Sequence, residues 1–289
     1  MNGNDWSPTN DRSTYRMMSE HGEAVRSATA DGMVVLSRLG NGASRVIALA
    51  PSIKFVLQGE ECYTIAGRAR RLKAGNFMLV EAGTEALVRV ASGSETIGLC
   101  IYLPTTSEPV LGLADIVRPV ITGTSVDPLA MLLRNYAEKL AQDRRVSGPV
   151  TNELLRDAAL GSQAFLSRFE LKSSALTQVR ASARTEVLQR LERALALIHA
   201  NVRRPLCLEE ISREAALSRF HLTRMFSKVY GSPPLSYHRK LRLKDAAREL
   251  RCGIASPTQI AEDLGYASLS AFSRAFRSEF GVPPSRLAA

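Results

Sequence analysis

The sequence contains an internal repeat near its C-terminus. Residues 218–234 realign with residues 268–284 at an offset of 50, so that Arg224 aligns with Arg274. Each copy predicts a helix that begins after a serine N-cap and ends at a glycine suited to the left-handed conformation. The Pro-Pro pair that follows prevents either helix from continuing. The repeat therefore predicts two copies of one small helical unit.

A shorter helix is predicted before each of these long helices, over residues 208–216 and 257–264. Three or four residues separate the members of each pair, which is the spacing of a helix-turn-helix. Gly265 in the second turn suits a positive φ, whereas Ala216 in the first turn lacks that freedom. The C-terminal part is thus predicted to carry two helix-turn-helix motifs.

Apolar residues occupy one face of each long helix and leave an exposed face rich in arginine and small polar side chains. Arginine can donate two hydrogen bonds to guanine in the major groove of DNA, serine and threonine can donate or accept, and an apolar group can touch the thymine methyl. Lys228 and Arg277 lie further along and suit phosphate contacts. The alternative is that these are ordinary solvated faces.

A single helix of 18 residues is predicted between the two motifs, over residues 234–251. At 1.5 Å per residue it would span about 27 Å. A spacer of that length could place two reading helices about one DNA turn, roughly 34 Å, apart. Four basic residues on it either meet the DNA backbone or are solvated charges: Arg239, Lys240, Arg242 and Lys244.

The N-terminal part has a different pattern. After a polar lead-in with a short predicted helix at residues 15–20, short Val, Ile and Leu runs separated by turn signals predict a β-sandwich or barrel between residues 32 and 103. Two helices follow, over about 127–140 and 150–169, and either pack on the β domain or join two copies of the protein. Residues 172–185 lose the periodicity and predict a linker.

Charge favours a polyanionic partner, since the net charge is +10 and the pI is near 9.8. Residues 186–289 hold 17 basic and 10 acidic residues, or +7 of the +10. No secretory signal or membrane span is predicted, and the four cysteines lack metal-site or redox spacing, so a reducing cytoplasm is expected.

An enzyme is disfavoured because the β region offers few groups for catalysis. All four histidines lie outside its predicted strands: His21, His199, His221 and His238. Its carboxylates Glu60, Glu61, Glu81 and Glu85 do not by themselves make the first-row metal site that such barrels use in catalysis. No phosphate-binding loop or activated nucleophile is recognised, so neither a metal nor a cofactor is expected.

Residues 188–287 resemble the DNA-binding domain of the AraC/XylS transcription regulators. The segments that carry the resemblance include PLCLEEISREAALSRFHLTRMFSKVYGSPP and IAEDLGYASLSAFSRAFRSEFGVPP. It implies seven helices, of which the third and sixth enter successive major grooves. Carried over position by position, it places base contacts on Arg219, Phe220, Thr223, Arg224, Ser270, Ala271, Ser273 and Arg274. One departure is Ser285 and Arg286, where the family usually has a tyrosine and an arginine.

Residues 51–80 resemble, less specifically, the cupin-type β-barrel at the N-terminus of many such regulators. That resemblance implies a small effector and a homodimer, and for an activator RNA polymerase as partner. Arg68, Arg70 and Arg71 could bind an anionic effector or be solvated. The sequence does not determine the effector, the operator or the oligomeric state, nor whether the protein activates or represses transcription.

The sequence thus predicts a multidomain α+β protein. Its expected parts are a flexible lead-in (1–30), a cupin-like sensor and dimerisation domain with two helices (31–171), a linker (172–185) and an all-α DNA-binding domain (186–289). The expected function is sequence-specific regulation of transcription on double-stranded DNA. The rival is a non-specific architectural DNA-binding protein, which needs no paired base-reading faces.

Overall fold

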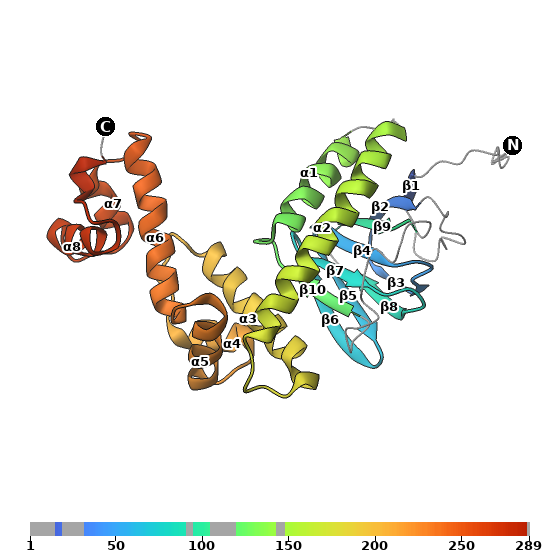
Figure 1. Ribbon diagram of the computed structural model, residues 1–289. Helices are drawn as coiled ribbons and strands as arrows, with labels where there is room; N and C mark the ends of the chain where they lie inside the picture. Colours follow the sequence, from blue (N-terminus) through green and yellow to red (C-terminus); the bar gives the residue numbers. More distant parts are fainter. Residues whose placement is uncertain (1–14, 19–31, 91–94, 105–119, 143–147, 288–289) are drawn as a thin grey trace, which may run out of the picture. The chain divides into compact units, whose positions relative to one another are not determined.

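The chain divides into two compact units, residues 1–170 and 171–289 (Figure 1). The structure is a computed structural model that describes residues 15–18, 32–90, 95–104, 120–142 and 148–287. Among these residues, no helix combines the length and the apolar character that crossing a bilayer would require. Each unit is described separately below.

The N-terminal unit is built on two β-sheets. The larger sheet has the strand order β1 (Tyr15–Met18), β2 (Met33–Leu39), β9 (Thr96–Tyr102), β4 (Ser52–Gln58), β7 (Phe77–Val80) and β10 (Val120–Gly123). The smaller sheet has the order β3 (Gly42–Ile47), β8 (Glu85–Val90), β5 (Glu60–Ile65) and β6 (Arg68–Lys73). Side chains alternate between half-buried and exposed positions along β3 and between buried and half-buried positions along β5, so each of these strands has one inward face.

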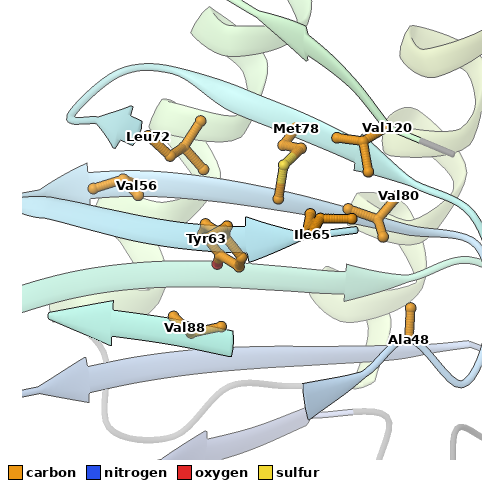
Figure 2. Close-up of a cluster of buried hydrophobic side chains, with 9 residues drawn as sticks. All are labelled: Ala48, Val56, Tyr63, Ile65, Leu72, Met78, Val80, Val88 and Val120. Atoms are coloured by element: carbon orange, nitrogen blue, oxygen red, sulfur yellow. The ribbon is translucent and has the colours of Figure 1, made fainter. Parts of the chain in front are cut away.

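The two sheets pack face to face around an apolar core, which makes this unit a β-sandwich (Figure 2). Val56, Met78 and Val80 from the larger sheet belong to the same buried cluster as Tyr63 and Val88 from the smaller one. Of the expected β-sandwich or barrel, the structure shows the sandwich. Closure of the strands into a cupin-like barrel stays a prediction.

Helices α1 (Pro128–Gln142) and α2 (Gly148–Ser174) pack on the other face of the larger sheet (Figure 1). Phe165 of α2 meets the ring of Phe77 edge-on, with 5.0 Å between the ring centroids. Asp127 caps α1 by accepting the backbone N–H of Leu129 at 2.9 Å, as the Asp-Pro signal predicts. The helices thus cover the sheet, and their use in pairing two copies stays a prediction.

The short helix expected at residues 15–20 is wrong for the part that the structure describes. Tyr15–Met18 is instead strand β1, which runs parallel to β2 with Tyr15 opposite Val34. The edge of β2 offers unpaired backbone groups, and pairing with it outweighs the local preference of a four-residue segment. The rest of the predicted lead-in, including His21, lies outside the described residues.

The C-terminal unit is helical. It contains α3 (Ala181–Ala200), α4 (Leu208–Ala215), α5 (Arg219–Tyr230), α6 (Pro234–Arg251), α7 (Pro257–Asp263), α8 (Leu269–Phe280) and the 3-10 helix η2 (Pro284–Arg286). The second half of the unit has its own core, in which Leu250 of α6, Ile260 of α7 and Phe272 of α8 are all buried. The first half buries Ile211, Leu222 and Phe226 completely.

The connection between α2 and α3 is shorter than the predicted linker. Residues 172–174 continue α2 and residues 181–185 begin α3, so only residues 175–180 of the predicted 172–185 are non-helical. Both helix ends were missed because this Ser- and Ala-rich sequence has few large apolar side chains, and helical periodicity is recognised from such side chains. The boundaries of the predicted sensor and DNA-binding domains stay predictions.

Candidate nucleic-acid interface

Helices α5 and α8 are two copies of one structural unit. Each has 12 residues and begins after a serine whose hydroxyl oxygen accepts a backbone N–H: that of His221 for Ser218, at 3.3 Å, and that of Ala271 for Ser268, at 3.1 Å. Each ends at a glycine with a left-handed backbone, at φ 78° and 75°. The repeated sequence signals therefore produce helices with the same start and the same end.

The turn before each of these helices also repeats. In the first turn Ala216 has φ 51°, and in the second Gly265 has φ 72°. Ala216 thus adopts a left-handed conformation, although it lacks the conformational freedom of glycine. The guanidinium groups of Arg190 and Arg193 on α3 donate to the last carbonyls of α4, at 2.8 Å for Ala216 itself. These bonds help to hold an alanine where a glycine would be more relaxed.

The exposed faces of α5 and α8 carry the side chains that the sequence assigned to DNA. Phe220 is 76% exposed, which is unusual for a phenylalanine and leaves its ring free to meet a partner. Of the other predicted base contacts, Arg219, Arg224, Ser270 and Arg274 are exposed, and Thr223, Ala271 and Ser273 are half-buried. Lys228 and Arg277, the predicted phosphate contacts, are also exposed.

Hydrogen bonds within α5 constrain what these side chains can do. The Thr223 hydroxyl donates to the backbone carbonyl of Arg219 at 2.8 Å, so its oxygen remains available as an acceptor. The guanidinium of Arg219 forms an ion pair with Glu209 of α4. One N–H of Arg224 donates to the side-chain oxygen of Gln178 at 2.7 Å. In the described part of the chain, Arg274 of the second copy has no such partner.

The first turn of α4 is fixed by two glutamates. Glu210 accepts the backbone N–H of Cys207 at 3.0 Å and a guanidinium N–H of Arg204 at 2.7 Å, and these contacts lower its pKa to about 2. The pKa of Glu209 is lowered by its own backbone N–H and by Arg219. Both carboxylates therefore stay charged at neutral pH, and α4 presents a rigid start beside α5.

The basic residues of α6 divide into two groups. Arg239 and Lys244 are exposed, and Lys240 forms an ion pair with Glu279 of α8 at 3.2 Å. Arg242 is half-buried and donates to the carbonyl of Leu264 at 2.5 Å, which places it at the second turn. Arg242 is thus a structural group of this turn as well as a basic residue of the spacer.

In the N-terminal unit, the three candidate arginines lie on strand β6 and do not share one face. Arg70 is opposite Tyr63 in the strand pairing, and because paired residues share a face, it lies on the side of the inter-sheet core. Arg71 is on the outer face and forms an ion pair with Glu60 at 3.1 Å. Arg68 is exposed.

Sequence reasoning missed a polar group inside the sandwich. The ammonium of Lys54 lies 2.5 Å from the sulfur of Cys100 and 4.7 Å from the centroid of the Tyr102 ring. Burial raises the pKa of Tyr102 to about 12. A small pocket beside them is lined by Lys54 and Tyr63 among apolar side chains. A lysine within the apolar run SIKFVL was the signal that could have found this group.

No group of three or more His, Cys, Asp or Glu side chains gathers to hold a metal ion within the described residues. Among the glutamates of the β-sandwich named above, Glu61 accepts the hydroxyl of Tyr63 at 2.5 Å. The pair of helix-turn-helix motifs is the site that the repeated geometry of α5 and α8 indicates.

Comparison with known proteins supports this emphasis. Residues 211–289 match a model of the helix-turn-helix domain. The chain is 38% identical over 91 residues to an AraC-like transcription regulator of Streptomyces lividans. The alignment covers 32% of this chain and 30% of that protein. It is 37% identical over 91 residues to the regulatory protein SoxS of Escherichia coli, covering 32% of this chain and 85% of SoxS.

Solved structures are also similar. The crystal structure of a regulator with an AraC-type DNA-binding domain from Chromobacterium violaceum matches 35% of this chain and 90% of that chain, at 31% identity and a TM-score of 0.33. ToxT from Vibrio cholerae matches 90% of this chain and 98% of that chain, at 15% identity and a TM-score of 0.36.

The chain spans about 30% of the length of the first of the curated relatives, so that relative's whole activity does not carry over. SoxS, in contrast, is matched over 85% of its length, and 37% of the aligned residues are identical. The chain therefore belongs to the AraC family of helix-turn-helix transcription regulators.

Proposed function

We propose that the protein is a sequence-specific DNA-binding transcription regulator that reads two successive major grooves with α5 and α8. The observation that carries this proposal is the duplication itself. Two helices of equal length, with the same serine and glycine ends, each present arginine and small polar side chains on an exposed face. A DNA-binding protein without sequence preference has no need of such paired faces.

The roles of the side chains follow from their chemistry. Arg224 and Arg274, at equivalent positions of the repeat, would each read guanine, and Phe220 would touch a thymine methyl. Thr223 would accept from an amino group of adenine or cytosine, because its own proton is already donated to the backbone. The other proposed base contacts are Arg219, Ser270, Ala271 and Ser273, and the proposed backbone contacts are Lys228 and Arg277.

Helix α6 supports the tandem arrangement. Its 18 residues give a length of about 27 Å, compared with roughly 34 Å for one turn of DNA. Both helix-turn-helix motifs pack against it, since residues of α6 contact both α5 and α8. A rigid rod of this kind would keep the two reading helices at a fixed separation.

The test is selection of bound sequences from random double-stranded DNA by the full-length protein. We expect a site with two boxes about one helical turn apart. Arg224→Ala should relax the base preference in one box and Arg274→Ala in the other, each at a loss of about 1–3 kcal/mol. Equal binding to all sequences would instead favour the architectural alternative and contradict this proposal.

We also propose that a small effector acts on the N-terminal unit and that two copies pair through it, as in the expected sensor and dimerisation domain (31–171). Lys54 and Tyr63 place a charged group and a hydroxyl group at a pocket between apolar side chains, and this pocket of about 10 Å³ would have to widen to take a small molecule. An activating regulator would in addition contact RNA polymerase.

The effector proposal is tested by thermal unfolding of the full-length protein against a broad panel of metabolites. A ligand should raise the unfolding temperature of the native protein and not that of the Lys54→Met variant. Absence of any shift across the panel would count against the effector. Sedimentation of the protein at several concentrations tests the dimer.

A further inference from the structure

The two reading arginines differ in their surroundings. Arg224 on α5 donates from Nη2 to the side-chain oxygen of Gln178 at 2.7 Å, across 46 positions of the sequence. Arg274, its equivalent on α8, has no hydrogen-bond or ion-pair partner among the residues that the structure describes. Gln178 belongs to the connection between α2 and α3, outside both helix-turn-helix motifs.

This connection is itself held in place. Leu176 is completely buried, and the carbonyl of Val179 accepts the Nε–H of Arg184 at 3.0 Å. Residues 175–180 are short, and two of their backbone amides already donate to carbonyls nearby. Gln178 is therefore attached to a backbone with little freedom to move.

A second set of contacts links the end of α2, which precedes this connection, to α5. Lys172, at the end of α2, forms an ion pair with Glu192 of α3 at 2.6 Å, and the Glu192 side chain is only 9% exposed. The same carboxylate oxygen accepts the hydroxyl of Tyr230 from α5 at 3.0 Å. The end of α2 before Gln178 and the helix that carries Arg224 thus both bind the buried carboxylate of Glu192.

The contact is compatible with base reading by Arg224. A guanidinium has five N–H donors, and two of them suffice for a guanine. Gln178 takes one hydrogen of Nη2 and leaves the remaining donors free. A side chain that is already held loses less conformational freedom when it binds, so the contact should favour the reading geometry.

We propose that Gln178 is a positioning residue that sets the guanidinium of Arg224 and thereby sharpens the base preference of the first helix-turn-helix motif. The inference rests on the proposed function, because it assumes that Arg224 reads a base. It predicts an asymmetry: the box read by α5 depends on a residue outside the motif, whereas the box read by α8 does not.

The experiment compares full-length Gln178→Ala with the matched control Thr177→Ala, an exposed neighbour in the same segment. Affinity is measured for the selected site and for every single-base change in both boxes. Gln178→Ala should reduce discrimination at the base read by Arg224 by about three- to tenfold, the net worth of one typical hydrogen bond. The second box and the Thr177→Ala variant should be unchanged.

Two further variants separate positioning from general destabilisation. In an Arg224→Ala background, Gln178→Ala should have no further effect on base preference, because the group that it positions is gone. Gln178→Glu keeps the acceptor and should retain the discrimination, while its added negative charge weakens binding to all sequences alike.

The outcomes distinguish the two proposals. If Arg224→Ala leaves the base preference of the first box intact, the proposed base reading fails. If Arg224→Ala relaxes that preference but Gln178→Ala behaves as Thr177→Ala does, base reading stands and the positioning role of Gln178 is overturned. Tighter binding by Gln178→Ala would also overturn it, since the contact would then withhold Arg224 from DNA.

Discussion

The two turns of the helix-turn-helix motifs provide a reciprocal test of backbone strain. Ala216 and Gly265 occupy the same left-handed position, at φ 51° and 72°. The left-handed conformation costs a non-glycine residue about 1–2 kcal/mol. Replacing alanine with glycine relieves that cost, but the freer unfolded chain offsets about 0.4–1 kcal/mol of the gain. Ala216→Gly should therefore stabilise the protein by roughly 0.5–1 kcal/mol.

Gly265→Ala should have the opposite effect. A Cβ atom added at Gly265 would meet no atom within 4 Å outside the adjacent residues, so only the conformational cost of the left-handed backbone remains. The expected loss is again roughly 0.5–1 kcal/mol, or a few degrees in Tm for a unit of this size.

Both variants are compared with the native protein by urea unfolding followed through the helical circular dichroism signal. The midpoint should rise for Ala216→Gly and fall for Gly265→Ala, with the slope of the transition unchanged. A lower midpoint for Ala216→Gly would refute the reasoning. It would mean that the methyl group of Ala216 makes contacts worth more than the strain.

Three further predictions concern binding, packing and pH. Lys228→Ala should weaken binding to all DNA sequences and reduce the slope of log affinity against log salt by about 1, measured by anisotropy titrations at several salt concentrations; an unchanged slope would exclude a phosphate contact. Phe272→Ala, at a fully buried position, should cost about 3–5 kcal/mol in urea unfolding, and a loss below 1 kcal/mol would contradict its place in the core. Burial lowers the pKa of His238 below its unfolded value near 6.5, so the stability linked to it is complete above pH 6.5 and is lost as the pH falls. His238→Gln should therefore reduce the loss of stability between pH 7.5 and 5.5, and an identical pH dependence in both proteins would oppose this.

The helical unit could be predicted closely because its signals are local. A serine, twelve residues with an apolar stripe, a glycine and a Pro-Pro pair lie within one short segment, and each signal acts on backbone next to it. Helix α6 begins at Pro234 and ends at Arg251, as the sequence predicts, because Pro is favoured at the first helical position.

Features that depend on distant pairing could not be predicted in the same way. Tyr15–Met18 is a strand only because β2 offers it an edge, and the charged segment Arg68–Lys73 is a strand only because β5 pairs with it. Lys54 meets Cys100 across 46 positions. Short periodicity carries no information about such contacts.

The candidate site shows the same division. Helical periodicity predicts that Arg224 of α5 and Arg274 of α8 face solvent, and both are exposed in the structure. The partner of Arg224 does not follow from any periodicity, since Gln178 lies in a segment without a regular pattern. The sequence thus identifies the groups that face outward, whereas only the fold identifies what holds them.

The hydrogen bonds from α3 to the end of α4 determine how short a working fragment can be. The region that matches the helix-turn-helix model begins at Ile211 and so omits Arg190 and Arg193. A fragment cut there would free the carbonyls of Glu214, Ala215 and Ala216 and leave a left-handed alanine without its donors. A fragment that keeps these contacts must therefore include Arg190 and Arg193 of α3.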